Sequence, residues 1–73
     1  MSNTEKTFVV ENMTCKHCVA NITRELTENN DISDVNADLD SKEVVVTYDD
    51  EKITADEIIN TLHEIEYEAQ LKE

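Results

Sequence analysis

The chain of 73 residues contains no glycine, no proline and no tryptophan. Without glycine it has no glycine-rich loop of the kind that cradles phosphate groups in nucleotide-binding proteins. Without proline and tryptophan it lacks the cis-proline loop and the aromatic-flanked cysteine pair that thioredoxin-like proteins use. These absences argue against a nucleotide-binding enzyme and against a thiol-disulfide oxidoreductase, although the second stays open as an alternative.

Long apolar segments are also missing. The longest uninterrupted apolar runs, at 8–10 and 44–46, are far shorter than the roughly 20 residues that a membrane-spanning helix needs. Residues 1–6 are polar, and the short apolar stretch after them is no signal-peptide core. The sequence therefore predicts a soluble, cytoplasmic protein that does not insert directly into a membrane.

Positive charge is scarce: the chain has six Lys and Arg residues and eighteen Asp and Glu residues, which gives a net charge of −12. This balance argues against nucleic-acid binding, which favours basic surfaces. Residues 1–24 carry three basic and two acidic side chains, whereas residues 25–73 carry three basic and sixteen acidic ones. The segment that contains both cysteines is the part of the chain that is not acidic.

The pattern of apolar residues predicts six elements in the order βαββαβ. Two-residue alternation indicates strands, and recurrence at three and four residues indicates helices. The expected elements are strands at 6–12, 35–39, 44–48 and 67–71 and helices at 15–28 and 54–65, with a turn at 40–42 joining the two middle strands. This order predicts an α+β, ferredoxin-like fold in which residues 1–73 form a single domain. Its four-stranded antiparallel sheet carries both helices on one face.

Apolar side chains of these elements are expected to form the core. The predicted core residues are Phe8, Val10, Val19, Ile22, Leu26, Val35, Leu39, Val44, Val46, Ile58, Leu62 and Ile65.

Chemistry concentrates at the two cysteines, Cys15 and Cys18, which are three positions apart. Two such neighbours cannot build a disulfide framework, and in a reducing compartment this spacing is typical of metal-binding or catalytic thiols. Soft thiolates select Cu(I) over hard cations. If Cys18 begins the helix, the helix amino terminus and the charge of Lys16 both lower the thiol pKa and favour metal binding.

The run MTCKHC at 13–18, placed after a strand and at the start of a helix, resembles the motif of the heavy-metal-associated domain family. The free-standing form of this domain, the bacterial cytosolic copper chaperone, is the most similar type. The resemblance extends over 8–71 and implies that Cys15 and Cys18 are the metal ligands. We also expect a monomer when metal-free, with a copper-bridged dimer as an open alternative at higher loading. Because a two-coordinate Cu(I) leaves room for an incoming thiolate, we expect transfer by ligand exchange. The implied partner is the metal-binding domain of a copper-transporting P-type ATPase, or a copper-responsive regulator.

Four further residues are expected to support the metal loop. On the resemblance, Met13 anchors the loop from beneath, and Tyr67 lies beside the site, where its hydroxyl can donate to a thiolate. Thr14 stands beside the first cysteine, where zinc-handling relatives often have a carboxylate. His17 is expected to be a bystander in the monomer and a third ligand in a dimer.

The chain departs from the family at two positions where glycine is common, Asn12 and Glu66. Asn12 can adopt a left-handed conformation, whereas Glu66 would bring a carboxylate near an anionic copper complex. The cations Lys16 and Arg24 are expected to lie on one side of the first helix and to form a docking patch for the partner. The alternative is that they are ordinary surface charges, with Arg24 paired to Glu28.

Other functions remain as alternatives. The same fold could serve as a regulatory metal-binding domain of a P-type ATPase, although the positions of Met1 and Glu73 favour an independent protein. Zinc prefers four ligands rather than two, and mercury carriers of this fold need an export signal. The two histidines have no serine nucleophile at motif spacing, so an enzyme is not expected.

Overall fold

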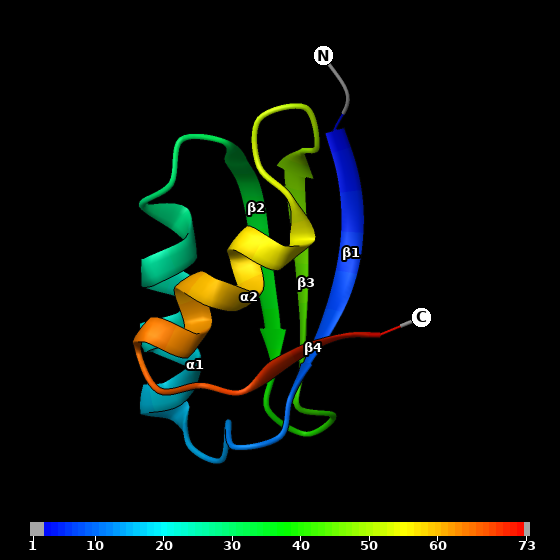
Figure 1. The fold of residues 1–73 in the computed structure, drawn as a ribbon. Helices are drawn as coiled ribbons and strands as arrows, with labels where there is room; N and C mark the ends of the chain where they lie inside the picture. Colours follow the sequence, from blue (N-terminus) through cyan, green and yellow to red (C-terminus); the bar gives the residue numbers. More distant parts are fainter. Residues whose placement is uncertain (1–2, 73) are drawn as a thin grey trace.

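The fold has the βαββαβ order that the sequence predicts. The computed structural model describes residues 3–72. Its elements are β1 (Asn3–Val10), α1 (Lys16–Thr27), β2 (Ile32–Asp38), β3 (Glu43–Asp49), α2 (Ala55–Glu64) and β4 (Ala69–Lys72). All strand pairs are antiparallel, and the sheet order is β2-β3-β1-β4 (Figure 1). The predicted ferredoxin-like architecture is confirmed.

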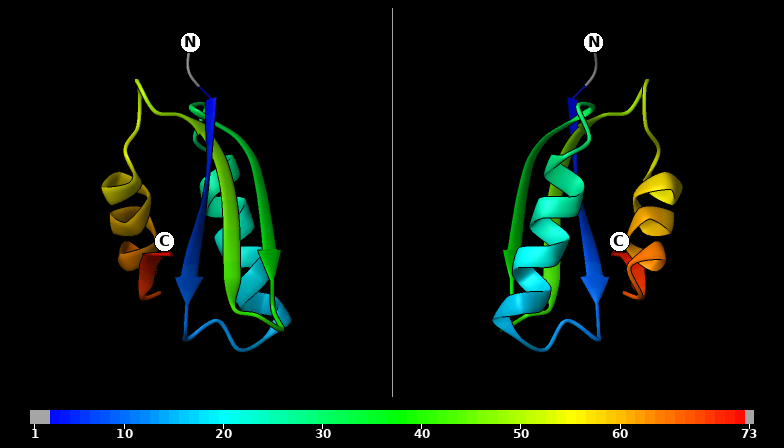
Figure 2. Two further views of the ribbon diagram at one scale, coloured as in Figure 1. Left: turned by 90° about the vertical axis from the view of Figure 1, so that its right-hand side faces the viewer. Right: turned by 90° about the vertical axis from the view of Figure 1, so that its left-hand side faces the viewer.

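Both helices cover the same face of the sheet, as Figure 2 shows. Helix α1 packs against β2, and α2 packs against β4. The hydroxyl of Thr54 accepts a 3.2 Å hydrogen bond from the Glu57 amide, and this N-cap begins α2. The amino end of α1 and the carboxyl end of α2 lie at the same end of the molecule (Figure 1).

The core lies between the sheet and the helices. Its buried side chains are Phe8, Val10, Met13, Ile22, Leu26, Ile32, Val44, Val46, Tyr48, Ile53, Ile58, Leu62 and Ala69. Most of the predicted core is confirmed, but Val19, Val35, Leu39 and Ile65 are only partly buried. They pack at the margin of the cluster, where neighbouring elements cover them incompletely.

Element boundaries differ from the prediction in three strands. Strand β2 begins at Ile32 rather than at residue 35. Strand β1 begins at Asn3, because its first residues pair with the end of β3, and it ends at Val10, where the chain turns toward the cysteines. Strand β4 begins at Ala69 rather than at Tyr67. The side chain of Leu71 in β4 is 37% exposed.

Candidate metal centre

The two cysteines meet at the amino end of α1. Cys15 is the N-cap residue, with extended backbone angles (φ −148°, ψ 166°), and Lys16 is the first helical residue. Cys18 therefore lies within the first turn, two residues after the helix begins. The carbonyl of Cys15 accepts hydrogen bonds from the amides of Cys18 and Val19, at 3.1 and 3.3 Å. This turn places the two Sγ atoms 3.2 Å apart, with both cysteines free.

The thiol of Cys18 ionises more readily than an ordinary cysteine. Its pKa is lowered to about 7, first by a hydrogen bond from the Tyr67 hydroxyl, then by Cys15 and by the backbone of Thr14, against a smaller opposing effect of burial. Hydrogen bonds to the charged form stabilise a thiolate. Since a metal binds the thiolate, less free energy is needed to displace the proton at neutral pH.

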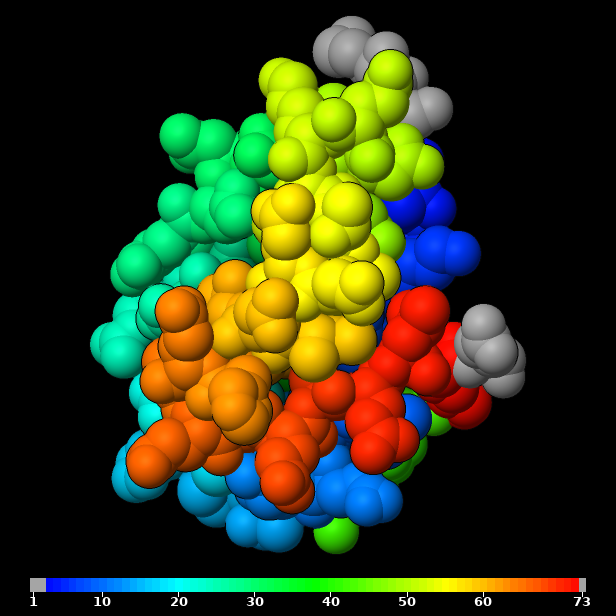
Figure 3. Space-filling model, in the orientation of Figure 1, coloured from blue at the N-terminus to red at the C-terminus, as the bar shows by residue number. Residues whose placement is uncertain are grey.

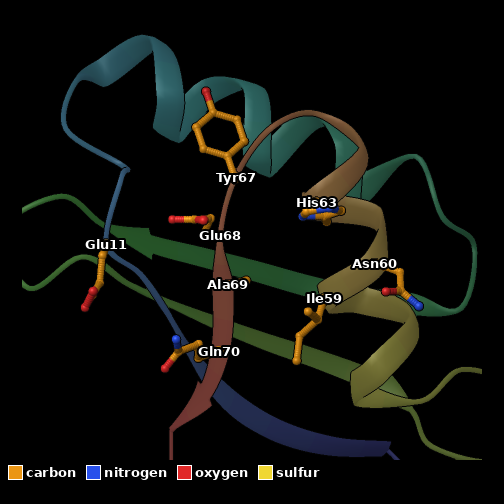
Figure 4. A pocket seen from close by; sticks show the side chains of 8 residues that line it. All are labelled: Glu11, Ile59, Asn60, His63, Tyr67, Glu68, Ala69 and Gln70. Carbon is orange, nitrogen blue, oxygen red and sulfur yellow. The ribbon is translucent and has the colours of Figure 1, made fainter.

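Tyr67 reaches this pair from the segment between α2 and β4. Figure 4 shows its ring rising toward α1. The hydrogen bond to Cys18 raises the pKa of the Tyr67 hydroxyl, and a hydrogen bond with Asn21 on α1 acts in the opposite direction. The hydroxyl therefore lies between two residues of α1. Tyr67 therefore lies beside Cys18.

The backbone before Tyr67 forms a Schellman motif at the end of α2. The amide of Glu66 donates to the carbonyl of His63, and the amide of Tyr67 donates to that of Leu62, both at 2.9 Å. Glu66 occupies the position after the C-cap with φ 71°, a conformation that favours glycine. The departure from glycine at position 66 is thus accommodated by a glutamate in the left-handed region.

Asn12 has a role that the sequence interpretation missed. Its Nδ2 donates to the carbonyl of Glu66 at 2.9 Å, and its Oδ1 accepts from the amide of Glu68 at 3.0 Å. Among residues 3–72, positive φ occurs at Lys42 and Glu66 and not at Asn12. Asn12 therefore replaces glycine with a side chain that makes tertiary contacts, not with a left-handed backbone.

The remaining loop residues differ in burial. Met13 is completely buried, and its amide donates to the carbonyl of Val10 at 3.1 Å. It therefore packs under the loop as core, as predicted. Thr14 and His17 are exposed. Within the described part of the chain, no group of three or more His, Cys, Asp or Glu side chains is arranged to hold a metal ion. The donors that the structure does bring together are the two sulfurs.

The two predicted docking cations lie on α1. Lys16 and Arg24 are both exposed, and Arg24 donates a 3.4 Å hydrogen bond to Oδ1 of Asn21. Among residues 3–72, Arg24 forms no ion pair with Glu28, whereas Lys72 pairs with Glu43. The guanidinium is thus directed back along the helix toward the residue that contacts Tyr67.

The space beside the site is open to solvent. The loop before α1 and the segment around 66–70 lie next to each other at one end of the surface (Figure 3). A shallow groove beside them has a lining of Glu11, Ile59, Asn60, His63, Tyr67, Glu68, Ala69 and Gln70 (Figure 4). In the part of the chain that the structure describes, neither helix has the length and apolar character needed to cross a bilayer.

Comparisons with known proteins agree with this geometry. The sequence model of the heavy-metal-associated domain matches residues 7–68. The copper chaperone CopZ of Enterococcus hirae is 31% identical over 64 residues, which are 88% of this chain and 93% of that protein. A putative copper-ion-binding protein of Bacillus anthracis is 30% identical with a TM-score of 0.89, over 94% of this chain and 97% of that one. A chain of the Atx1-Cu(I)-Ccc2a complex is 28% identical with a TM-score of 0.84, over 94% of each chain.

Proposed function

Because the chain belongs to the heavy-metal-associated domain family, we propose that it is a cytoplasmic, single-domain copper(I) chaperone. It holds one Cu(I) between Cys15 and Cys18 and passes it to a partner protein. The observation that carries this proposal is the pair of sulfurs 3.2 Å apart at a helix amino terminus. The similarity to proteins named as copper chaperones supports copper as the cargo.

Two thiolates suit Cu(I) by chemistry and by number. Sulfur donors are soft and select Cu(I), which accepts a low coordination number, whereas Zn(II) in proteins takes four ligands. Cys15 is exposed and Cys18 is half-buried, so the ion would be bound at the surface. The lowered pKa of Cys18 means that copper replaces a proton that is already weakly held.

Surface exposure also supports transfer by ligand exchange. A thiolate of the partner can bond to the copper before either resident sulfur leaves, so three-coordinate intermediates take the place of free ion. The bond to Cys15 or Cys18 then breaks, and that sulfur is available to take up a proton. Met13 keeps the loop anchored in the core during the exchange. The Tyr67 hydroxyl stabilises the sulfur of Cys18 through its hydrogen bond.

The proposed partner is the metal-binding domain of a copper-transporting P-type ATPase. The resemblance to a chain of the Atx1-Cu(I)-Ccc2a complex supports a partner of the same fold. Lys16 and Arg24 are exposed cations on the helix that carries the site, in a chain whose net charge is −12. They would attract acidic side chains around the partner's metal site, which raises the association rate more than the affinity.

Copper transfer to such a domain tests the proposed exchange. The transfer rate should rise with acceptor concentration and should exceed the rate at which a low-molecular-weight chelator removes copper. A rate that is independent of acceptor concentration would instead show release of the free ion. The variant Cys15→Ser with Cys18→Ser should bind no copper tightly, which serves as the blank.

Charge reversal on α1 tests the docking surface separately. Lys16→Glu with Arg24→Glu should slow transfer at low salt and flatten its salt dependence, because exposed charges are screened beyond about 8 Å at physiological ionic strength. Lys6→Glu with Lys52→Glu is the matched control, because it changes the net charge equally at exposed positions outside α1. Equal rates for the two double variants would contradict a docking role for Lys16 and Arg24.

A further inference from the structure

The side chain of Asn12 joins two parts of the chain that are far apart in sequence. Its two hydrogen bonds, to Glu66 and Glu68, span 54 and 56 residues. The regular β1–β4 ladder ends at the pair Val10 and Ala69. The Asn12 carboxamide thus continues the attachment between these segments beyond the last backbone pair.

The two bonded groups lie on either side of Tyr67. The carbonyl of Glu66 belongs to the peptide unit that enters Tyr67, and the amide of Glu68 belongs to the one that leaves it. One carboxamide, with a donor and an acceptor, therefore holds both peptide units. A glycine at position 12 would have no side chain with which to do this.

The residue that Asn12 holds is the one that contacts the cysteines. The Tyr67 ring points toward α1 (Figure 4), and its hydroxyl is the largest cause of the lowered pKa of Cys18. The backbone amide of Tyr67 bonds to Leu62 of α2. Asn12 comes from the loop that leads to Cys15, three residues later. It therefore links this loop directly to the backbone on both sides of Tyr67.

We propose that Asn12 is a positioning residue for the metal centre: its carboxamide fixes the backbone around Tyr67 and so holds the Tyr67 hydroxyl against Cys18. The claim deepens the proposed copper function and rests on it for its consequence for binding. Both hydrogen bonds of Asn12 are exposed to solvent, where water can replace them, so their loss should alter the position of Tyr67 more than the stability of the fold.

The first test uses the reduced, metal-free protein and needs no metal. Nuclear Overhauser contacts between the Tyr67 ring and the Cβ protons of Cys18 should be present in the wild type and weak or absent in Asn12→Ala. Exchange of the Glu68 amide hydrogen should be faster in the same variant. Asn12→Asp keeps the acceptor for the Glu68 amide but loses the donor to Glu66, so it should give an intermediate result.

Asn29→Ala is the matched control. Its Oδ1 also accepts a backbone hydrogen bond, from Asp31 at 2.9 Å, in the turn between α1 and β2. The control should leave both the Tyr67–Cys18 contacts and the Glu68 exchange unchanged. Contacts that persist unchanged in Asn12→Ala would overturn the proposal. So would an equal loss of contacts in the Asn29→Ala control.

A double-mutant cycle tests the consequence for copper. Tyr67→Phe should lower Cu(I) affinity by about twofold to tenfold, the range of a single hydrogen bond, and Asn12→Ala by no more than that. In the Tyr67→Phe background, Asn12→Ala should cause no further loss. If Asn12→Ala lowers Cu(I) affinity equally in the wild type and in Tyr67→Phe, the claim that Asn12 acts through Tyr67 is refuted. If the wild type binds no copper, the proposed function fails, but the metal-free contacts still decide the positioning claim.

Discussion

Glu66 holds a left-handed backbone conformation that glycine adopts at lower cost, and replacing it should stabilise the domain. Its φ is 71°, and its amide and the next one complete the Schellman motif at the end of α2. The side chain is exposed, so Glu66→Gly removes no core contact. The hydrogen bond from Asn12 goes to the Glu66 carbonyl, which glycine retains.

The expected gain follows from two opposing terms. The left-handed conformation costs an L-residue about 1–2 kcal/mol, and Glu66→Gly removes this cost. Glycine in turn has greater freedom in the unfolded chain, which costs about 0.5–1 kcal/mol on folding. From the middle of the two ranges, the net gain is about 0.5–1 kcal/mol. For a domain of this size it corresponds to a rise in Tm of about 2–8 °C.

Thermal and urea unfolding followed by circular dichroism measure this gain. Glu66→Ala is the control, because it removes the same charge but keeps a Cβ atom and hence the conformational cost. Lys42→Gly provides a second, independent case, since Lys42 has φ 59° in the turn between β2 and β3. If Glu66→Ala stabilises the domain as much as Glu66→Gly, relief of charge repulsion explains the gain and the backbone argument is refuted.

Four further predictions concern the cysteine loop. Tyr67→Phe should raise the pKa of Cys18 from about 7 toward the ordinary thiol value, as pH-dependent alkylation would show. Because the pKa of Cys18 is lowered in the folded state, ionisation of this thiol stabilises the fold above the unfolded pKa, and the effect is lost as the pH falls through about 7. If the difference in stability between the wild type and Cys18→Ser does not depend on pH, this prediction is contradicted. His17→Ala should leave Cu(I) affinity of the dilute monomer unchanged and weaken a copper-bridged dimer in sedimentation experiments, whereas a large loss in the monomer would make the imidazole a ligand. Cys15→Ser with Cys18→Ser should keep the circular-dichroism spectrum of the wild type, and its loss would make the pair structural.

The fold could be predicted because local patterns and topology agree. The alternation in β1 and β3 and the N-cap at Thr54 are local features, which determine their elements without help from distant residues. The ends of the strands were less predictable, because they depend on which residues of the neighbouring strands are available for pairing. Tyr67 continues the alternation of β4 in sequence, but its amide is bonded to Leu62 of α2, so the strand begins two residues later.

The cysteine motif and the burial of Met13 were predictable from the sequence, whereas the contacts of Asn12 were not. The spacing of Cys15 and Cys18 and their place at a helix start follow from local sequence. The contacts of Asn12 join residues more than fifty positions apart, and no local pattern encodes them. The departure from glycine at positions 12 and 66 was visible in the sequence. Only the folded arrangement shows that the first residue bonds to the backbone of the second.

Metal selectivity at the two sulfurs is the central claim, and an anaerobic titration of the reduced protein tests it most directly. The protein is titrated with Cu(I) against a chromophoric competitor, and with Zn(II) in parallel. The account predicts one Cu(I) per chain at low loading, with an affinity far above that for Zn(II), because Cys15 and Cys18 supply two soft donors and Zn(II) takes four ligands. Zinc binding that equals or exceeds copper binding would contradict the assignment.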